Sequence, residues 1–211
     1  MVIIIGNQKG GAGKSTLALL LANYLSQVRE RKVTVLDMDY QQSLASKAEK
    51  ARVLENDAPY EVVSAALETF PSLHRALGSA KGEMVLVDLP GKMDDNGLVP
   101  IFKAADAVLC PFSYDEFSVD STVLFAMVLR KINPRAPLIF VPNRVKTTVR
   151  YETREEVERA LANFGVVTPP LADRVDFQRI ATGATPAILY PVALPVLDLV
   201  YDQYLDRGDS P

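Results

Sequence analysis

Residues 2–16 read Val-Ile-Ile-Ile-Gly-Asn-Gln-Lys-Gly-Gly-Ala-Gly-Lys-Ser-Thr. The first four residues are β-branched and uncharged, which is typical of a buried parallel strand. A glycine-rich loop follows at once and ends in Lys-Ser-Thr, the order found in phosphate-binding loops. The stretch therefore predicts an α/β protein that binds a nucleoside triphosphate where its first strand ends.

The loop residues suit this chemistry one by one. Gly10, Gly11 and Gly13 let successive backbone N–H groups point at phosphate oxygens. A helix that begins near residues 13–15 places the positive end of its dipole under the same phosphates. Lys14 is placed to reach the β- and γ-phosphates, and the Ser15 hydroxyl to ligate Mg²⁺. We expect a nucleoside triphosphate to bind Gly10, Gly11, Ala12, Gly13, Lys14, Ser15 and Thr16.

The loop departs from the general pattern G-x-x-x-x-G-K-[ST], because Gln8 stands where that pattern has glycine, and Lys9 follows it. One interpretation is a degenerate loop that no longer binds nucleotide. The sequence K-G-G-x-G-K-[ST] instead resembles the deviant Walker A loop of the ParA/MinD family of partition and positioning ATPases. That resemblance implies a homodimer in the ATP state, in which Lys9 of each protomer contacts the phosphates held by the other.

A second strand is expected over residues 33–39, with Asp37 and Asp39 on one face at its carboxyl end. The family has D-x-D here, usually followed by Pro-Gln, whereas Tyr40 precedes Gln41 in this chain. By resemblance, Asp39 orients the attacking water and Asp37 supports the water shell of Mg²⁺. The alternative is that one aspartate caps the next helix.

A third strand over residues 84–87 ends in Asp88, which forms a Walker B element that holds Mg²⁺ through water. By resemblance, the Gly91 N–H senses the γ-phosphate. The catalytic residues expected are Lys9, Lys14 and Asp39, and the metal-binding residues expected are Ser15, Asp37, Asp39 and Asp88.

Asn143 follows an apolar strand over residues 138–142. In the family an asparagine at this place hydrogen-bonds adenine, and an amide carries both the donor and the acceptor that a base edge needs. A turn asparagine that closes the strand is the alternative, and it has the same local sequence.

Strands and helices alternate along the chain, which predicts a P-loop NTPase-like α/β fold with a mostly parallel twisted sheet and helices on both faces. We expect one domain over residues 1–206 and a short polar tail over 207–211. Helices are expected near residues 97–104, 119–132 and 153–164, and strands at 106–112, 138–142 and 166–168. Residues 44–82 are expected to form two or three short helices, broken by Pro59 and Pro71.

Composition limits the classes of function. The chain has 211 residues, 48% of them apolar, and a single cysteine, Cys110, in an apolar run that predicts a buried strand position. One cysteine argues against the related ATPases that hold an iron–sulfur cluster. The single histidine, His74, is expected on a solvated helix face, and no metal beyond nucleotide-bound Mg²⁺ is implied.

Membrane contact is not expected. The chain enters its first strand without a positively charged lead, which favours a cytoplasmic protein. A helix over residues 196–205 carries Asp198 and Asp202 on its polar face, and acidic groups are repelled by anionic lipid. We interpret it as a helix that packs against the sheet, with a MinD-like membrane-cycling ATPase as an alternative.

The charge of the chain allows two interpretations of nucleic-acid binding. The net charge is −3, yet residues 130–179 hold ten Lys and Arg against six Asp and Glu, a local balance of +4. Such a patch, doubled in a dimer, would bind DNA phosphates without sequence preference. A solvated helix face with interleaved Glu and Arg residues is the alternative.

These features favour a short ParA-type ATPase that uses ATP and Mg²⁺, dimerises, binds DNA non-specifically on the nucleoid and is stimulated by a ParB-like partner. The competing hypotheses are a metabolic P-loop enzyme of the dethiobiotin-synthetase type and a binding module without hydrolysis. The cargo, whether plasmid, chromosome or a protein assembly, is not marked by any motif.

Overall fold

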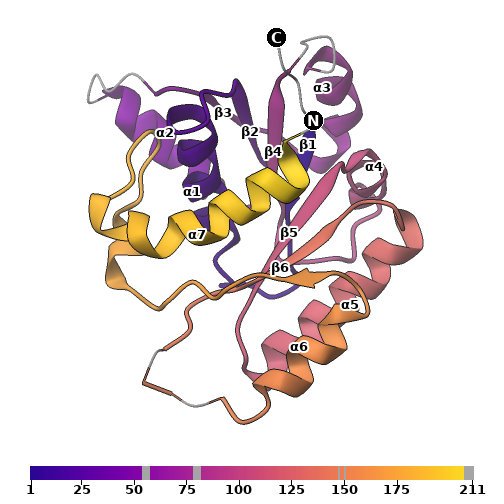
Figure 1. The fold of residues 1–211 in the computed structure, drawn as a ribbon. Helices are drawn as coiled ribbons and strands as arrows, with labels where there is room; N and C mark the ends of the chain where they lie inside the picture. Colours follow the sequence, from indigo (N-terminus) through magenta and orange to yellow (C-terminus); the bar gives the residue numbers. More distant parts are fainter. Residues whose placement is uncertain (54–57, 78–81, 147, 150, 207–211) are drawn as a thin grey trace.

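The computed structural model describes residues 1–53, 58–77, 82–146, 148–149 and 151–206 (Figure 1). The polar tail expected over residues 207–211 lies outside the described residues. The same holds for Arg150, one of the ten basic residues counted above.

The described strands form one sheet, and every neighbouring pair in it is parallel. The order across the sheet is β3-β2-β4-β1-β5-β6-β7. Because β1 lies between β4 and β5, the chain winds outward in both directions from it, and ligands of such sheets bind at this switch point. The strands are β1 (Val2–Ile5), β2 (Val33–Asp37), β3 (Glu61–Ser64), β4 (Met84–Asp88), β5 (Ala107–Phe112), β6 (Leu138–Pro142) and β7 (Val166–Val167).

Helices cover both faces of the sheet (Figure 1). Side chains alternate along β1, so Ile3 and Ile5 pack with α1 and α7, while Val2 and Ile4 pack with α3, α4, α5 and α6. This arrangement confirms the P-loop NTPase-like fold class. The helices are α1 (Lys14–Gln27), α2 (Ser43–Val53), α3 (Phe70–Leu77), α4 (Leu98–Ala104), α5 (Glu116–Ile132), α6 (Arg154–Ala162) and α7 (Tyr190–Val200). The shorter turns are η1 (Leu67–Thr69), η2 (Val175–Arg179), η3 (Ala187–Leu189) and the π-helical η4 (Tyr201–Leu205).

Helix α1 is buried on all sides rather than along one stripe. Every residue from Leu17 to Leu25 is buried, because α7 covers the side that faces away from the sheet. Val28 follows the last helical residue, and 47% of its surface is exposed.

The C-terminal helix packs on the protein, as expected. Ala193, Val196, Leu197 and Val200 join the core around α1. The helix starts at Tyr190, earlier than the sequence indicated, and its last turn continues into η4. Asp198 and Asp202 on its polar side pair with Arg29, which lies just beyond α1.

The expectation for residues 44–82 is partly wrong. The described part of this region contains the short helices α2 and α3, but also the strand β3, which pairs with β2 at the edge of the sheet. Only two of its four residues, Val62 and Val63, are apolar, so no long hydrophobic run marked it. Pro71 does not break a helix, because it is the second residue of α3, where a missing N–H costs little.

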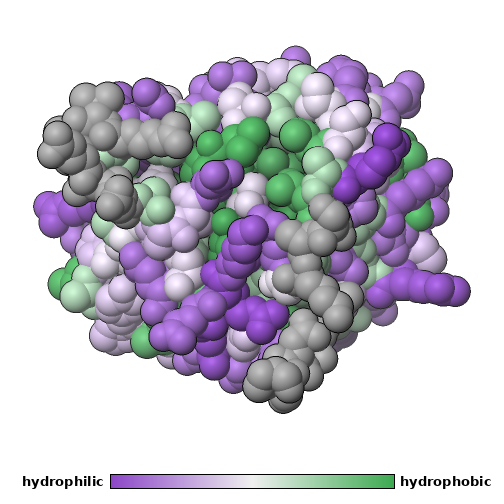
Figure 2. All heavy atoms as spheres, turned by 90° about the horizontal axis from the view of Figure 1, so that it is seen from above, coloured by the Kyte–Doolittle hydropathy of each residue, from purple (hydrophilic) through white to green (hydrophobic). Residues whose placement is uncertain are grey.

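Figure 2 looks down on the edge of the sheet where β1 begins, opposite the end that holds the P-loop. Hydrophobic side chains gather near the middle of this face, and hydrophilic side chains surround them. Polar groups at the strand starts are paired: the Met1 amine donates to the Glu83 carbonyl, and the Val2 N–H donates to the Asp106 carboxylate. These contacts are structural and lie far from the phosphate loop.

Candidate nucleotide-binding site

A cavity of about 420 Å³ opens where the parallel strands end. Four loops line it: the loops after β1, β2 and β4, and the loop after β6 through Arg144. The first contributes most of the residues expected to bind ATP, namely Gly10, Gly11, Gly13, Lys14, Ser15 and Thr16. The structure therefore brings the predicted phosphate-binding residues together around one hollow.

The backbone of the loop requires glycine at two positions. Gly11 and Gly13 have φ of 76° and 93°, a region that residues with a side chain rarely adopt. At Gly13 a Cβ would lie 2.2 Å from Nδ2 of Asn143. Since Gly13 is also the residue before α1, the helix N-terminus is directed at the cavity as predicted.

A buried asparagine at the base of the loop was missed by the sequence reasoning. Asn7 is fully buried; its Nδ2 donates to the Pro111 carbonyl at 2.8 Å and to Thr122 Oγ1 at 2.9 Å. Its Oδ1 accepts the Lys9 N–H at 3.1 Å. Asn7 thus ties the phosphate loop to β5 and α5, and its position two residues after a buried strand was the available signal.

Lys14 lies inside the cavity with 6% of its surface exposed. Its ammonium donates to the Lys9 carbonyl at 3.2 Å. Burial lowers the pKa of this ammonium, although the nearby carboxylates of Asp88 and Asp39 oppose the shift. A cation this poorly solvated is ready to bind an anion, because an incoming phosphate would replace the lost hydration.

Asp88 ends β4 and is completely buried, and among the described residues neither of its carboxylate oxygens has a hydrogen-bond partner of good geometry. Burial raises the pKa of this carboxyl to about 7; the Ser15 hydroxyl and the Lys14 charge oppose the rise, and the Asp37 charge adds to it. Orphaned buried carboxylate oxygens are unusual in native structures and point to a missing partner.

The donors present fit Mg²⁺. Carboxylate and hydroxyl oxygens, here Asp88 and Ser15, are the hard ligands that this ion prefers. Among the described residues no three His, Cys, Asp or Glu side chains form a metal cage. Nucleotide-bound Mg²⁺ does not need one, because it takes one or two protein ligands and completes its shell with water and phosphate oxygens.

The two aspartates after β2 have different surroundings. Asp37 is buried, and its Oδ2 accepts the N–H groups of Leu44 and Ala45 at 2.9 Å each. It therefore caps α2, the alternative left open by the sequence. Burial raises the pKa of Asp37, and these hydrogen bonds oppose the rise. Asp39 instead lines the cavity, and its Oδ1 accepts the Gln41 N–H at 2.9 Å.

β2 ends at Asp37, so the strand expected through residue 39 is too long. The chain turns between the end of β2 and the start of α2, and Gln42 adopts a φ of 47° just before that helix. Metal roles for Asp37 and Asp39 stay predictions. The geometry favours Asp39 for contact with a ligand in the cavity.

Asn143 lies against the phosphate loop. Its Nδ2 donates to the Ala12 carbonyl at 2.9 Å, and its Oδ1 accepts the Arg144 N–H at 3.0 Å. Half of its hydrogen-bonding capacity is thereby used on the protein, and adenine recognition stays a prediction. The next residue, Arg144, has a φ of 56° and lines the cavity.

The Lys9 side chain is directed to Asp115 rather than into the cavity. Its ammonium lies 2.5 Å from Oδ1 of Asp115, and Lys9 is not among the residues that line the cavity. Asp115 also accepts the Ser118 N–H at 3.0 Å, which caps α5. Burial opposes the shift, but hydrogen bonds from Lys9, Ser113 and the Ser118 N–H hold the pKa of Asp115 below its usual value.

The loop after β4 rests on the phosphate loop. A Cβ on Gly91 would lie 3.4 Å from both N and Cα of Gly10 and 3.6 Å from the Lys14 ammonium. A backbone that passes this close to the lysine suits the predicted contact of the Gly91 N–H with a γ-phosphate. Further lining residues that the sequence analysis did not assign to the site are Tyr40, Gln41, Ser43, Lys92 and Arg144.

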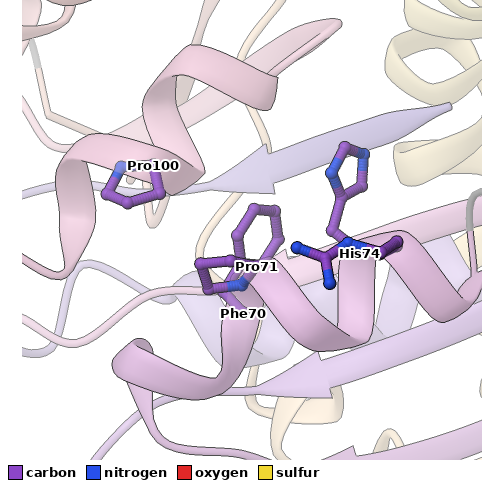
Figure 3. A pocket seen from close by; sticks show the side chains of 5 residues that line it. Phe70, Pro71, His74 and Pro100 are labelled. Carbon is purple, nitrogen blue, oxygen red and sulfur yellow. The ribbon is translucent and has the colours of Figure 1, made fainter.

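A second hollow, of about 610 Å³, lies on α3 and α4 and is lined by Phe70, Pro71, His74, Arg75 and Pro100 (Figure 3). The His74 ring stacks on Phe70, with ring centres 5.3 Å apart and planes inclined by 7°. The prediction of a solvated histidine is therefore wrong in part, because His74 is half-buried and packs on an aromatic ring. Among the described residues, no carboxylate, thiol or hydroxyl lines this hollow.

Parallel α/β architecture, a glycine-rich loop opening α1 and a Walker B aspartate beside a buried lysine define a P-loop nucleotide-binding protein. Residues 3–185 match the family model described as the CobQ/CobB/MinD/ParA nucleotide binding domain, and the chain belongs to this family. The resemblance seen in the sequence to ParA/MinD proteins is confirmed.

Two characterised relatives narrow the comparison. The chain is 27% identical over 198 residues to the protein ParA of Rhizobium radiobacter, covering 85% of this chain and 81% of that protein. It is 33% identical over 134 residues to the maintenance of carboxysome distribution protein A of Gloeobacter kilaueensis, covering 63% of this chain and 57% of the relative.

Solved structures agree with this fold. A protein from Borrelia burgdorferi B31 described as a plasmid partition protein, bound to AMPPNP, superimposes with a TM-score of 0.65 at 25% identity and covers 84% of this chain and 87% of its own. McdA from Cyanothece in complex with ATP gives a TM-score of 0.74 at 18% identity, over 100% of this chain and 98% of its own.

Some basic side chains of residues 130–179 are held by contacts within the protein, so fewer are available to DNA than the composition indicated. Arg130 donates to the carbonyl oxygens of Phe164, Pro134 and Ala136, Arg154 pairs with Glu158 at 2.8 Å and Arg179 pairs with Asp176 at 3.3 Å. These three side chains act within the fold. Arg179 is nevertheless exposed, and the other exposed cations among the described residues of the stretch are Lys131, Arg135, Arg144, Lys146, Arg159 and Arg174.

No helix in the described ranges is both long and apolar enough to cross a membrane.

Proposed function

We propose that the protein is a ParA-type partition or positioning ATPase that binds Mg²⁺ and ATP, dimerises in the ATP state and hydrolyses ATP slowly until a partner stimulates it. Family membership and the nucleotide-bound neighbours support ATP as the ligand. The finer steps rest on the residues of the site.

The observation that carries the proposal is the contrast between the two lysines of the loop. Lys14 is buried in the cavity, where it serves the nucleotide of its own protomer. Lys9 points out of the cavity and is held by Asp115, with side-chain exposures of 31% and 48%. A loop lysine that does not line its own cavity is available to a second protomer that docks against this face.

The energies permit such a transfer. A solvent-exposed ion pair like that of Lys9 and Asp115 contributes about 0–1 kcal/mol. A charge-assisted hydrogen bond from a lysine to phosphate inside a closed, water-poor interface contributes more, about 1.5–3 kcal/mol. Release of Lys9 from Asp115 would therefore be favourable once two protomers enclose the triphosphates. Asp115 keeps its backbone partner at the start of α5 throughout.

The other side chains take roles that fit their positions. Ser15 and Asp88 would hold Mg²⁺, which neutralises the charge that develops on the phosphates. Lys14 binds the phosphates, Asp39 orients the attacking water from the cavity wall, and Lys9 of the second protomer stabilises the transition state. Asn143 would keep the loop in register with the base through its contact to Ala12.

We further propose that the dimer binds DNA non-specifically through exposed cations such as Lys131, Arg135 and Lys146, and that a ParB-like partner selects the cargo. A dimer doubles the number of phosphate contacts, which makes DNA binding depend on ATP and steeply on salt. A cytoplasmic, nucleoid-associated protein would result.

The test is the mass of the full chain in solution with Mg²⁺ and a slowly hydrolysed ATP analogue, measured by light scattering, together with analogue affinity. The wild type is expected to dimerise, Lys9→Ala to bind the analogue as a monomer, and Lys14→Ala to lose binding by roughly a hundredfold, the cost of removing a buried charged contact. Lys103→Ala, an exposed lysine on α4, is the matched control and should behave as wild type.

A Lys9→Ala protein that dimerises like the wild type would refute the role of Lys9 in the other protomer. A wild type that stays monomeric at saturating analogue would refute the dimer cycle. DNA retention measured at two salt concentrations with and without ATP completes the test, and retention that ignores ATP would contradict the proposed DNA cycle.

A further inference from the structure

Tyr40 occupies the position where the ParA/MinD pattern usually has proline, and the structure places it at the wall of the nucleotide cavity. Its hydroxyl donates to Oδ2 of Asp95 at 3.4 Å. Tyr40 belongs to the loop after β2, which carries Asp39, and Asp95 belongs to the loop after β4, which carries Gly91. The contact therefore joins two of the four loops that line the cavity.

We propose that Tyr40 is a positioning residue for hydrolysis, whose hydroxyl holds the Asp39 turn against the loop from Gly91 to Asp95. The inference rests on the proposed ATPase function and extends it to this position. Tyr40 itself is not assigned to the reacting atoms.

Asp95 is a firm anchor for such a link. Its Oδ1 accepts the Gly97 N–H at 2.7 Å, and its carbonyl accepts the Leu98 N–H at 3.2 Å. Both contacts lie at the start of α4. Close packing holds this point, because a Cβ on Gly97 would lie only 2.9 Å from Cβ of Leu67. Oδ2 of Asp95 is thus presented from a fixed helix start.

The Asp39 turn needs an anchor of this kind. Asp39 accepts the Gln41 N–H through its side chain and the Gln42 N–H through its carbonyl, both at 2.9 Å, so the turn is held internally. The Tyr40 ring, however, is 65% exposed and is not fixed by burial. The Met38 N–H donates to the Asp88 carbonyl just before the turn, and the hydroxyl contact to Asp95 adds a side-chain link from the turn itself to the loop that rests on Lys14 and Gly10.

The consequence for hydrolysis is geometric. A water oriented by Asp39 must lie in line with a γ-phosphate bound by Lys14 and the Gly91 N–H, and small displacements of an orienting group cost rate. A 3.4 Å contact is long, and such contacts often shorten when the nucleotide is bound. The link should therefore affect the hydrolysis rate more than nucleotide affinity.

The first experiment needs no catalysis. Hydrogen exchange of nucleotide-free Tyr40→Phe should be faster than wild type in residues 39–43 and 91–97, and unchanged in β1 and α1. The full chain with Mg²⁺ and ATP should then show a kcat lowered about fivefold, the effect of one net hydrogen bond, with nucleotide affinity within about twofold. Tyr204→Phe, a tyrosine of η4 far from these loops, is the matched control and should match wild type in both measurements.

A double-mutant cycle with Asp95→Ser separates the link from other effects, because serine keeps one oxygen acceptor for the start of α4 and has no second polar atom for Tyr40. The double variant should be no slower in hydrolysis than the slower single variant. Unchanged exchange and kcat in Tyr40→Phe, or multiplicative losses in the double variant, would overturn the proposal. A wild type without ATPase activity would refute the proposed function instead, and exchange would still decide whether Tyr40 and Asp95 are linked.

Discussion

Two polar regions of this molecule lie on either side of α1 and differ in how well their groups are paired. Between α1 and the segment from η2 to η4, Asn23 and Arg29 each bind several partners within the protein. At the carboxyl edge of the sheet, both oxygens of Asp88 and Oε1 of Gln8 are buried without a partner among the described residues. The Thr182 hydroxyl is one such atom on the first side.

The contrast separates buried polar groups that stabilise the fold from buried polar groups that are placed to bind a ligand. Buried groups that satisfy each other specify the packing of helices and contribute stability. Buried groups left unpaired reduce stability until a ligand completes them. By this criterion the site is the edge with Lys14 and Asp88, and the Asn23 side is scaffold.

The largest effect on stability should come from Asn23→Ala on the scaffold side. Oδ1 of Asn23 accepts from the Tyr60 hydroxyl at 2.7 Å and the Gly183 N–H at 2.9 Å, and its Nδ2 donates to the Ala181 carbonyl and to Thr185 Oγ1. Alanine removes all four hydrogen bonds, one of them from the buried Tyr60 hydroxyl and three to half-buried groups, which should lower the free energy of unfolding by about 3 kcal/mol. Denaturant unfolding measures this loss.

ATP-analogue affinity should stay within about twofold in the same variant, because no Asn23 partner belongs to the cavity. Asn163→Ala, an exposed asparagine at the end of α6, is the control and should cost under about 1 kcal/mol. A stable Asn23→Ala protein, or one that loses nucleotide binding while folded, would erase the distinction between the two regions.

The second prediction concerns pH and Asp88. The folded pKa of this carboxyl, about 7, lies above the ordinary value of 3.8. The folded state therefore keeps a proton that the unfolded chain has released, and the free energy of unfolding falls as pH rises between these values. From pH 5 to pH 8 this group should cost roughly 2.5 kcal/mol, and Asp88→Asn should remove that part of the pH dependence.

The measurement is urea unfolding of both proteins without nucleotide at the two pH values. The quantity compared is the change in the free energy of unfolding with pH, the slope, in each protein. Comparing slopes cancels the contribution of Asp115, whereas Asp37 is coupled to Asp88 by charge, so the difference in slope reports these two carboxyls together. Mg²⁺ with an ATP analogue should flatten the wild-type dependence. Equal slopes in the two proteins would show that Asp88 is already paired.

The sequence predicted the parts of this site that depend on short, continuous stretches of residues. The phosphate loop, the order of strands and helices around it and the Walker B position of Asp88 follow from short runs in which each residue type has one physical use. The buried Cys110 on β5 followed from its apolar neighbours in the same way.

What the sequence could not supply are contacts between distant residues. Lys9 and Asp115 are 106 positions apart, and Asn143 reaches Ala12 over 131. Asp37 and the start of α2 are close in sequence, but the D-x-D pattern is the same whether Asp37 caps this helix or supports a metal ion. β3 was missed because an edge strand of four residues depends on pairing with β2 rather than on its own hydrophobicity.

The smallest effect is expected from Arg29, which joins α1 to α7. Its guanidinium pairs with Asp198 and Asp202 at 2.9 Å each and lies 4.4 Å from the centre of the Tyr201 ring. With 27% of the side chain exposed, solvent weakens these ion pairs, so Arg29→Ala should lower the free energy of unfolding by only about 1 kcal/mol. Arg29→Lys keeps the charge but not the planar fork, and should recover part of that loss.

Hydrogen exchange should locate the Arg29→Ala effect in α7 and η4, because the pairing carboxylates and the ring belong to these segments. ATP-analogue affinity and dimer mass should not change, since the cavity is formed by other loops. A variant that exchanges faster around β1 and the phosphate loop, or that binds the analogue several-fold more weakly, would mean that the C-terminal helix controls the nucleotide site. The two polar regions would then act as one coupled unit through α1.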